Sequence, residues 1–299
     1  MKTRREFLKH TGLAVSALSM PWSLVAVAQE RLPRRRIPGT DEDLPIVGLG
    51  NARAFLDGDM ETSRQLMEAF RRHGGSYMDC IFGVRDTVAQ LVGELQAQDD
   101  IFIGAYVMGE TDEASRGEIA RILERSGKAS VDLIHAWNEY AVPNWDLMRR
   151  WKDEGLARYI GVSRNASEHY PDIISLMETG TVDIVQVNYS ALETDAEDRI
   201  LPMAMDMGIG VNINRPFLNG DYFSIVSGHE LPEWAADLDC ETWAQLSLKF
   251  ILSHPAVTCV VTDTSNPEHV IDNVRGGLGR MPDDSERARI LAHLKALAA

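Results

Sequence analysis

Short apolar runs alternate with amphipathic segments along most of the chain. The apolar runs are IVGLG (46–50), SYMDC (76–80), IFIGAYV (101–107), VDLIHAW (131–137), RYIGVS (158–163), VDIVQVNYS (182–190), IGVNINR (209–215) and VTCVVTDT (257–264). Segments with helical periodicity lie between and after them, at 62–73, 87–98, 113–126, 146–154, 167–178, 195–207, 243–253, 268–274 and 284–297. Strands that alternate with helices are typical of βαβ units and a parallel sheet.

Eight such units in a chain of 299 residues favour a closed barrel over an open doubly wound sheet. No GxGxxG follows the first apolar run, which counts against a dinucleotide-binding fold of the open-sheet type. The pattern therefore predicts the α/β class, with a single-domain (β/α)8 TIM barrel. Chemistry in such barrels gathers where strands end, and the residues at those ends are Asp79, Tyr106, Trp137, Ser163, Gln186, Arg215 and Thr264.

The run VDLIHAW places a histidine and a tryptophan in an otherwise apolar strand. Leu133, His135 and Trp137 alternate with Ile134 and Ala136, so the three side chains share one face of the strand. His135 is then either a barrel-interior histidine with a hydrogen-bond partner or a relocated catalytic residue. Trp137 is predicted to border a pocket at the strand end.

The first residues have the composition of an export signal. A basic start, an apolar middle and Ala26-Val27-Ala28 predict a signal peptide over residues 1–28, and Thr3-Arg4-Arg5-Glu6-Phe7 fits the twin-arginine pattern. The alternative is an uncleaved anchor, although Pro21 interrupts the apolar run. We expect a periplasmic protein with an N-terminal arm at 29–37 and the barrel at 38–299. The run Arg34-Arg35-Arg36 in this arm is expected to be solvated.

Net charge and cysteine content limit the kinds of ligand and partner that the protein is expected to bind. Removal of residues 1–28 takes away a net +3 and lowers the formal charge from −15 to −18, so nucleic acid and anionic lipid are poor partners. Cys80, Cys240 and Cys259 match no metal-binding spacing and are expected to be buried thiols, with a disulfide between two of them left open. The dispersed histidines predict no metal site. A small-molecule ligand is expected; the oligomeric state stays open.

Several segments resemble the aldo-keto reductases: LPIVGLGN (44–51), EGLARYIGVS (154–163), VDIVQVNYS (182–190), ILPMAMDMGIGVNINRPFLNG (200–220) and ILSHPAVTCVVTDTSNPEHVIDN (251–273). The resemblance covers nearly all of residues 38–297 and is most similar to the branch exported by the twin-arginine route. It implies a barrel that binds NADP(H) across the strand ends and reduces carbonyl groups with an Asp, Tyr, Lys and His tetrad.

Carried over residue by residue, the resemblance keeps only one member of this tetrad. The family Asp matches Asp79, whereas Val84 stands at the Tyr position, with Phe82 or Arg85 as alternatives. Tyr106 stands at the Lys position and Trp137 at the His position. Tyr106 then either replaces the missing acid or only fills the volume of the lysine.

The residues that the family uses for its cofactor are better kept. Ser163 and Gln186 match those that hold the nicotinamide carboxamide. The loop over the pyrophosphate matches Pro216, Phe217 and Gly220, with Arg215 beside it, and the adenosine segment matches Thr264, Ser265, Asn266, His269 and Asn273. Asp263 stands where the family has glycine, which adds negative charge, and NAD(H) stays open as the cofactor.

Three hypotheses follow from these residues. The first is a nicotinamide-dependent oxidoreductase with altered chemistry. The second is a non-catalytic barrel that binds a small molecule or a protein partner in the periplasm. The third is a different enzyme that uses Asp79, Tyr106 and His135 in the same pocket.

Overall fold

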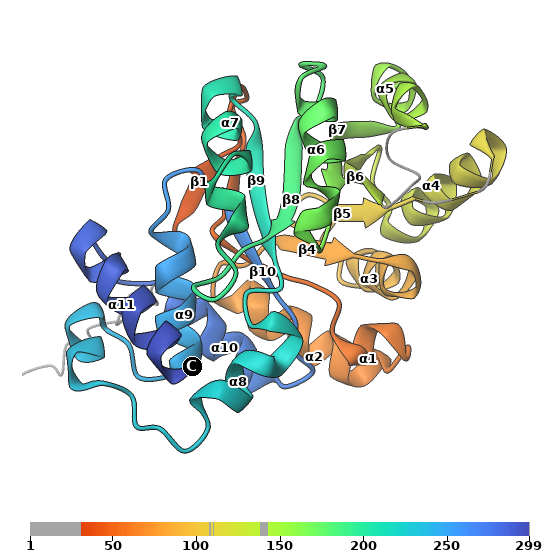
Figure 1. Cartoon of the computed structure of the whole chain (residues 1–299). Helices are drawn as coiled ribbons and strands as arrows, with labels where there is room; N and C mark the ends of the chain where they lie inside the picture. Colours follow the sequence, from red (N-terminus) through yellow and green to blue (C-terminus); the bar gives the residue numbers. More distant parts are fainter. Residues whose placement is uncertain (1–30, 108, 110, 138–142, 299) are drawn as a thin grey trace, which may run out of the picture.

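A computed structural model describes residues 31–107, 109, 111–137 and 143–298. The predicted signal peptide at 1–28 lies outside these residues. Eight parallel strands close a barrel in the order β10-β3-β4-β5-β6-β7-β8-β9 (Figure 1). Their bounds are β3 Val47–Leu49, β4 Tyr77–Cys80, β5 Phe102–Tyr106, β6 Val131–Trp137, β7 Ala157–Ser163, β8 Ile184–Asn188, β9 Gly210–Asn214 and β10 Cys259–Thr262. The predicted (β/α)8 barrel and each of its eight strands are confirmed.

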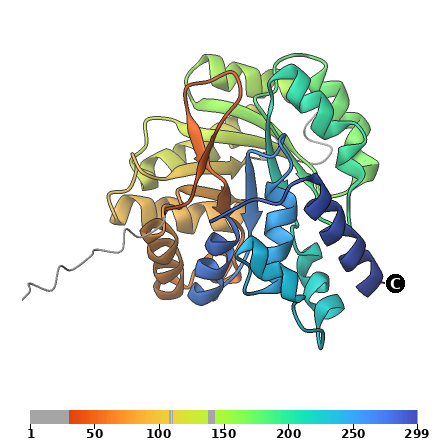
Figure 2. The ribbon, with the colours of Figure 1, turned by 90° about the vertical axis from the view of Figure 1, so that its left-hand side faces the viewer.

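Helices surround the strands (Figure 2). Their bounds are α1 Arg53–Leu56, α2 Met60–Arg72, α3 Phe82–Glu94, α4 Asp112–Ser126, α5 Trp145–Asp153, α6 Tyr170–Met177, α7 Ile200–Met207, α8 Asp221–Val226, α9 Trp243–Leu252, α10 Pro267–Gly276 and α11 Asp284–Leu297. All predicted helices are present. Helix α3 begins at Phe82 rather than at 87, and α1 and α8 were not predicted. Within the described part of the chain, no helix combines the length and apolar character needed to cross a bilayer.

Several helices begin and end where local chemistry dictates. The side chains of Asp59, Thr111 and Thr242 accept hydrogen bonds from backbone N–H groups in the first turns of α2, α4 and α9. Asp283 and Glu286 form a reciprocal capping box at the start of α11. Helix α4 ends at Gly127, whose φ of 72° lies in the left-handed region that glycine tolerates.

A β-hairpin closes the amino-terminal end of the barrel, and both views show it at the end opposite α8 (Figures 1 and 2). Strand β1, Arg34–Arg36, pairs antiparallel with β2, Asp43–Pro45. Ile37 and Leu44 are fully buried in a cluster with interior side chains of the barrel strands. The expectation of a solvated arginine run holds for Arg34 and Arg36, which are exposed. It is wrong for Arg35, which donates hydrogen bonds of 2.5 Å to the carbonyl oxygens of Val257 and Leu252.

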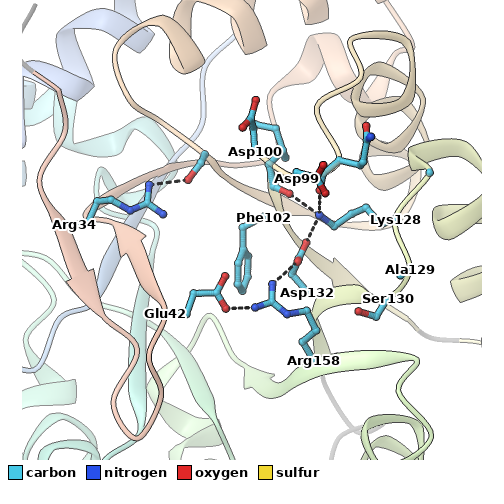
Figure 3. A pocket seen from close by; sticks show the side chains of 14 residues that line it. Arg34, Glu42, Asp99, Asp100, Phe102, Lys128, Ala129, Ser130, Asp132 and Arg158 are labelled. Carbon is cyan, nitrogen blue, oxygen red and sulfur yellow. Dashed lines mark hydrogen bonds and ion pairs between the residues drawn. The ribbon is translucent and has the colours of Figure 1, made fainter.

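A polar cavity of about 490 Å³ lies beside this hairpin (Figure 3). Arg158 bonds to Glu42 and, at 2.8 Å, to Asp132, and Lys128 lies 3.0 Å from the other oxygen of Asp132. Arg34 donates to the hydroxyl of Ser76 at 3.1 Å. Because the cations of this cavity are paired with groups on the hairpin and at the strand starts, we interpret the network as the attachment of the hairpin.

Glycines on the inner faces of the strands make room for large interior side chains. A Cβ atom on Gly161 would lie 2.6 Å from the carbonyl oxygen of Ile184 and 3.0 Å from Nδ1 of His135. A Cβ atom on Gly104 would lie 2.7 Å from the hydroxyl of Tyr77. The polar layer described below therefore depends on the absence of side chains at these positions.

The first prediction concerns this space. Gly161→Ala is expected to lower the free energy of unfolding by about 1–3 kcal/mol, because the added methyl group overpacks the barrel interior. Gly117→Ala is the control: it lies on the exposed face of α4 with no atom within 4 Å of the added Cβ. It should stabilise the fold by about 0.5–1 kcal/mol through helix propensity. Urea denaturation measures the free energy of unfolding of both variants. If Gly161→Ala is as stable as the wild type, the proposed overpacking is refuted.

Candidate functional site

A cleft opens at the carboxyl ends of the strands. It has a volume of about 590 Å³, and its floor includes Tyr106 at the end of β5 and Trp137 at the end of β6. The two rings meet edge to face with centroids 5.8 Å apart. The remaining lining residues come from the end of β9, the segments after the strands, the start of α3 and α8: Asn51, Ile81, Phe82, Asn165, Asn214, Arg215, Pro216, Phe217, Asn219, Gly220, Phe223 and Asp263.

A second cavity of about 360 Å³ adjoins this cleft. Both are lined by Phe217, Phe223 and Asp263, so the two cavities lie side by side, and we interpret them as two parts of one elongated groove. The smaller cavity is completed by residues of α9, α10 and the segments before them: Thr242, Trp243, Ala244, Thr264, His269, Asp272 and Asn273. The groove therefore runs from the mouth of the barrel to the start of α10.

A layer of buried polar side chains lies at the floor of the larger cavity. The hydroxyl of Tyr106 donates to Oγ of Ser163 at 2.9 Å and accepts from Nε2 of Gln186 at 3.0 Å. The same Nε2 donates to Oδ2 of Asp79 at 3.2 Å. Ser163 and Gln186 are buried and line neither cavity. Their polar groups are directed to Tyr106 and Asp79 rather than to the groove.

The network continues into the barrel. Tyr77 donates to Oδ1 of Asp79 at 3.1 Å and accepts from Nδ2 of Asn212 at 3.1 Å. Nε2 of His135 lies 3.5 Å from the Tyr77 hydroxyl, and its ring stacks on Tyr106 with centroids 5.0 Å apart. His135 therefore lies in the barrel interior with a hydrogen-bond partner, which is the first of the two alternatives that the sequence left open for this residue.

Burial controls the charge of this layer. Loss of solvent raises the pKa of Asp79 to about 7, although the hydrogen bond from Gln186 acts in the opposite direction. Burial lowers the pKa of His135 to about 3, so its imidazole is neutral at physiological pH. Burial and the nearby Asp79 raise the pKa of Tyr106 well above its ordinary value. Among the described residues that line the larger cavity, none is a lysine.

Asp263 stands where the two cavities meet. Its Oδ1 accepts a hydrogen bond of 2.8 Å from the backbone N–H of Asn51. A Cβ atom on Gly50 would lie 2.2 Å from Oδ1, so only glycine at position 50 permits this placement. Desolvation by the surrounding protein raises the pKa of Asp263 to about 6, but the side chain has access to solvent in the open groove, which weakens this effect.

The residues matched to the family's pyrophosphate and adenosine sites divide into two groups. Arg215, Pro216, Phe217, Gly220, Thr264, His269 and Asn273 line the groove. Ser265 instead accepts from the backbone N–H of Ala54 at 3.0 Å, and Asn266 caps α10 by accepting from that of Glu268 at 2.9 Å. Neither Ser265 nor Asn266 lines either cavity.

The three candidates for the family's tyrosine position also separate. Val84 is fully buried in α3, whereas Phe82 lines the larger cavity. Arg85 is buried, donates to the carbonyl oxygen of Tyr106 and pairs with Glu118 at 2.9 Å. Arg85 thus holds the end of β5 in place.

Sequence reasoning missed several residues of the groove. Asn165 and Asn214 lie at or just beyond strand ends, and a wider search of those ends would have included them. Phe223 and Trp243 come from α8 and the start of α9, which no strand-end rule examines. Among the described residues, no group of three His, Cys, Asp or Glu side chains is arranged to hold a metal ion. The three cysteines are buried free thiols, as expected.

The fold and the position of the groove define a (β/α)8 barrel with its site at the carboxyl end of the strands. Residues 47–224 match the Aldo/keto reductase family, and the chain belongs to that family.

Relatives with known names agree with this assignment. A curated relative, the NADH-specific methylglyoxal reductase of Escherichia coli, is 25% identical over 196 residues, which cover 54% of this chain. The match spans 59% of the length of that relative. Among solved structures, an aldo-keto reductase of Klebsiella pneumoniae in complex with NADPH has a TM-score of 0.71 at 18% identity, over 89% of this chain and 95% of that one. The holo aldo-keto reductase AKR11C1 of Bacillus halodurans has a TM-score of 0.69 at 20% identity, over 88% and 96%.

The second prediction follows from Asp79. Because its pKa is higher in the folded protein than the ordinary 3.8, the folded state binds more protons between pH 4 and pH 7. Asp79 therefore costs stability as the pH rises through that interval, on the scale of about 1.4 kcal/mol per pKa unit. The Asp79→Asn variant should gain stability relative to the wild type from pH 5 to pH 8 in urea denaturation. If the difference in unfolding free energy between Asp79→Asn and the wild type does not change with pH, the raised pKa of Asp79 is refuted.

Proposed function

We propose that this protein binds a nicotinamide dinucleotide in the groove and acts as an oxidoreductase with altered chemistry. The observation that carries the proposal is the junction of the two cavities into one groove across the strand ends. An elongated dinucleotide needs such a path, with room for a second reactant at one end. Membership of the family and the NADPH and NADP found in solved relatives support the same ligand.

The residues of the groove fit much of this ligand. Arg215 lines the larger cavity and offers a guanidinium group that is suited to a pyrophosphate. Thr264, His269 and Asn273 supply polar groups in the smaller cavity, beside the aromatic rings of Phe217 and Trp243. When bound, the nicotinamide group would supply hydride transfer.

Ser163 and Gln186 fit less well. In the family they hold the nicotinamide carboxamide, but here they are buried and bonded to Tyr106. A nicotinamide group bound in the groove would therefore lack these two contacts and would meet Tyr106 instead. This is the sense in which the chemistry of the site is altered.

We further propose that the usual catalytic tetrad is replaced. Asp79 is retained, but Tyr106 and Trp137 stand at the lysine and histidine positions, and the family's tyrosine position holds Val84 or a neighbour. The support is the absence of a lysine among the described lining residues and the neutral state of His135. Tyr106 is the one phenol at the floor of the cavity that could give a proton to a nascent alkoxide.

A non-catalytic barrel is the second candidate function. It is favoured by the raised pKa of Tyr106, which makes the phenol a weaker proton donor. In this alternative the groove would bind a small molecule or part of a protein partner without turnover. Activity assays of the variants below distinguish the two functions.

We also propose export by the twin-arginine route to the periplasm. Support comes from the basic, apolar and small-residue regions of residues 1–28 and from Arg4-Arg5. Because this route carries folded proteins, an exported oxidoreductase would take its nucleotide with it. Residues 29–37 and 38–299 then form the arm and barrel of the mature protein, with the hairpin strand β1 already within the arm.

The third prediction tests the ligand. The mature protein, purified from its exported form and then unfolded, should release a nicotinamide nucleotide detectable by absorbance and mass. The refolded protein should rebind NADH or NADPH with saturable quenching of tryptophan fluorescence, since Trp137 and Trp243 line the groove.

Arg215→Met should weaken nucleotide binding by about 10-fold or more, as expected for the loss of a charge-assisted hydrogen bond. Arg199→Met, which removes an exposed arginine of an ion pair with Glu178, is the control. Absence of released nucleotide and of saturable binding would reject the proposal.

The fourth prediction tests the proton donor. Tyr106→Phe should lower carbonyl reduction by about 100- to 10,000-fold, the usual contribution of a positioned general acid. Nucleotide affinity should stay the same or rise, because Ser163 and Gln186 lose their bonds to the hydroxyl. The rate and the dissociation constant are measured on the same preparation. Unchanged turnover would exclude Tyr106 as the acid, and no turnover in the wild type would favour the non-catalytic barrel.

A further inference from the structure

We infer that the groove selects a dinucleotide whose adenosine ribose has a free 2′-hydroxyl, so that NAD(H) binds in preference to NADP(H), and that Asp263 is the residue responsible. The inference rests on the proposed function. It goes beyond it by assigning the cofactor class and the residue that selects it.

The two cavities cannot exchange roles. The redox reaction requires the nicotinamide ring and a second reactant to meet at a proton donor, and Tyr106 lies in the larger cavity. The smaller cavity, of about 360 Å³, lies against the starts of α9 and α10 and has the rings of Phe217, Phe223 and Trp243 in its walls. Such walls suit a flat adenine base. The adenosine half of the ligand therefore belongs in the smaller cavity.

The smaller cavity is acidic. Asp263 and Asp272 line it, and none of its described lining residues is a lysine or an arginine. Asp272 is fixed by hydrogen bonds from Oγ1 of Thr242 at 2.9 Å and from Nε2 of Gln245 at 2.6 Å. His269 is the one histidine among these described lining residues, and its Nδ1 lies 3.4 Å from the hydroxyl of Thr264. A 2′-phosphate carries about −1.5 to −2 charges at pH 7 and would meet two carboxylates without a dedicated cation.

Asp263 occupies the place where the adenosine ribose must pass. In a dinucleotide, the ribose joins the adenine to the pyrophosphate, so it lies at the junction of the two cavities, and Asp263 lines both. Oδ1 of Asp263 is held by the N–H of Asn51, while Oδ2 has no hydrogen-bond partner among the described residues. A carboxylate at the ribose accepts hydrogen bonds from its hydroxyl groups and repels a phosphate placed there.

The pairing of Asp263 with Gly50 shows that this carboxylate is accommodated by the fold. A Cβ atom at position 50 would overlap with Oδ1 at 2.2 Å, so a larger residue there would force the carboxylate to move. Arg215, in contrast, lines only the larger cavity, where a pyrophosphate is common to both cofactors. Arg215 thus favours the pyrophosphate, which both cofactors contain, whereas Asp263 disfavours the 2′-phosphate, which only NADP(H) contains.

The fifth prediction compares the two cofactors directly. Mature protein freed of nucleotide is titrated with NADH and NADPH by calorimetry at one pH and salt concentration. NADH should bind more tightly by at least about 10-fold, the size expected for one charge-assisted hydrogen bond. Asp263→Asn should reduce this ratio, and His269→Arg should shift it toward NADPH, because the added guanidinium group can pair with a 2′-phosphate.

Asp206→Asn is the matched control, because it removes one negative charge from the exposed surface of α7 and should leave the ratio unchanged. Equal or tighter binding of NADPH by the wild type would overturn the inference but leave the proposed function intact. Binding of neither nucleotide would instead reject the proposed function. A preference for NADH that Asp263→Asn does not alter would overturn the assignment to Asp263.

Discussion

The hydroxyl of Tyr106, held between Ser163 and Gln186, is the interaction on which the rest of the site depends. Gln186 uses the same nitrogen to bond Asp79, so the phenol, the amide and the carboxyl form one buried layer across the top of the barrel. Among the described residues, no cation forms an ion pair with Asp79: the imidazole of His135, 3.8 Å away, is neutral. Burial therefore brings the pKa of Asp79 near 7.

This layer separates two parts of the protein with different tasks. Below it, Tyr77, Asn212 and the hairpin residues Ile37 and Leu44 fill the barrel and hold its shape. Above it, the groove exposes Trp137, Arg215 and Asp263 to a ligand. The polar groups of Ser163 and Gln186 are thus directed into this layer rather than toward the groove. A barrel can change its chemistry in this way without changing its strands, because the site is built on loops and strand ends.

Much of the fold could be predicted from the sequence, because most residues of the barrel strands are buried on both faces, and strands such as β3, β8 and β10 are buried throughout. The alternation within 131–137 also predicted that His135 and Trp137 share one face. The strand-end rule placed Asp79, Tyr106 and Trp137 near the site. The hairpin could not be predicted in this way, because Arg34, Arg35 and Arg36 read as a solvated charge run, and only tertiary contacts with Val257, Leu252 and Ser76 show its role.

The details of the site were harder to predict for a related reason. Ser163 and Gln186 stand at the expected strand ends, but only the structure shows that Tyr106, from another strand, bonds to both. Ser265 and Asn266 are likewise committed to α1 and to the start of α10. Phe223 and Trp243 reach the groove from helices that the strand-end rule does not consider. Such contacts depend on the packing of distant segments, which local patterns do not encode.

The central claim is that the groove holds a dinucleotide above a floor sealed by Tyr106. A crystal structure of the protein grown with saturating NADH tests it most directly. The account predicts electron density for the adenosine in the smaller cavity, with a ribose hydroxyl within hydrogen-bond distance of Asp263, and for the pyrophosphate beside Arg215. An empty groove at saturating NADH, or a nucleotide bound elsewhere on the barrel, would contradict the account.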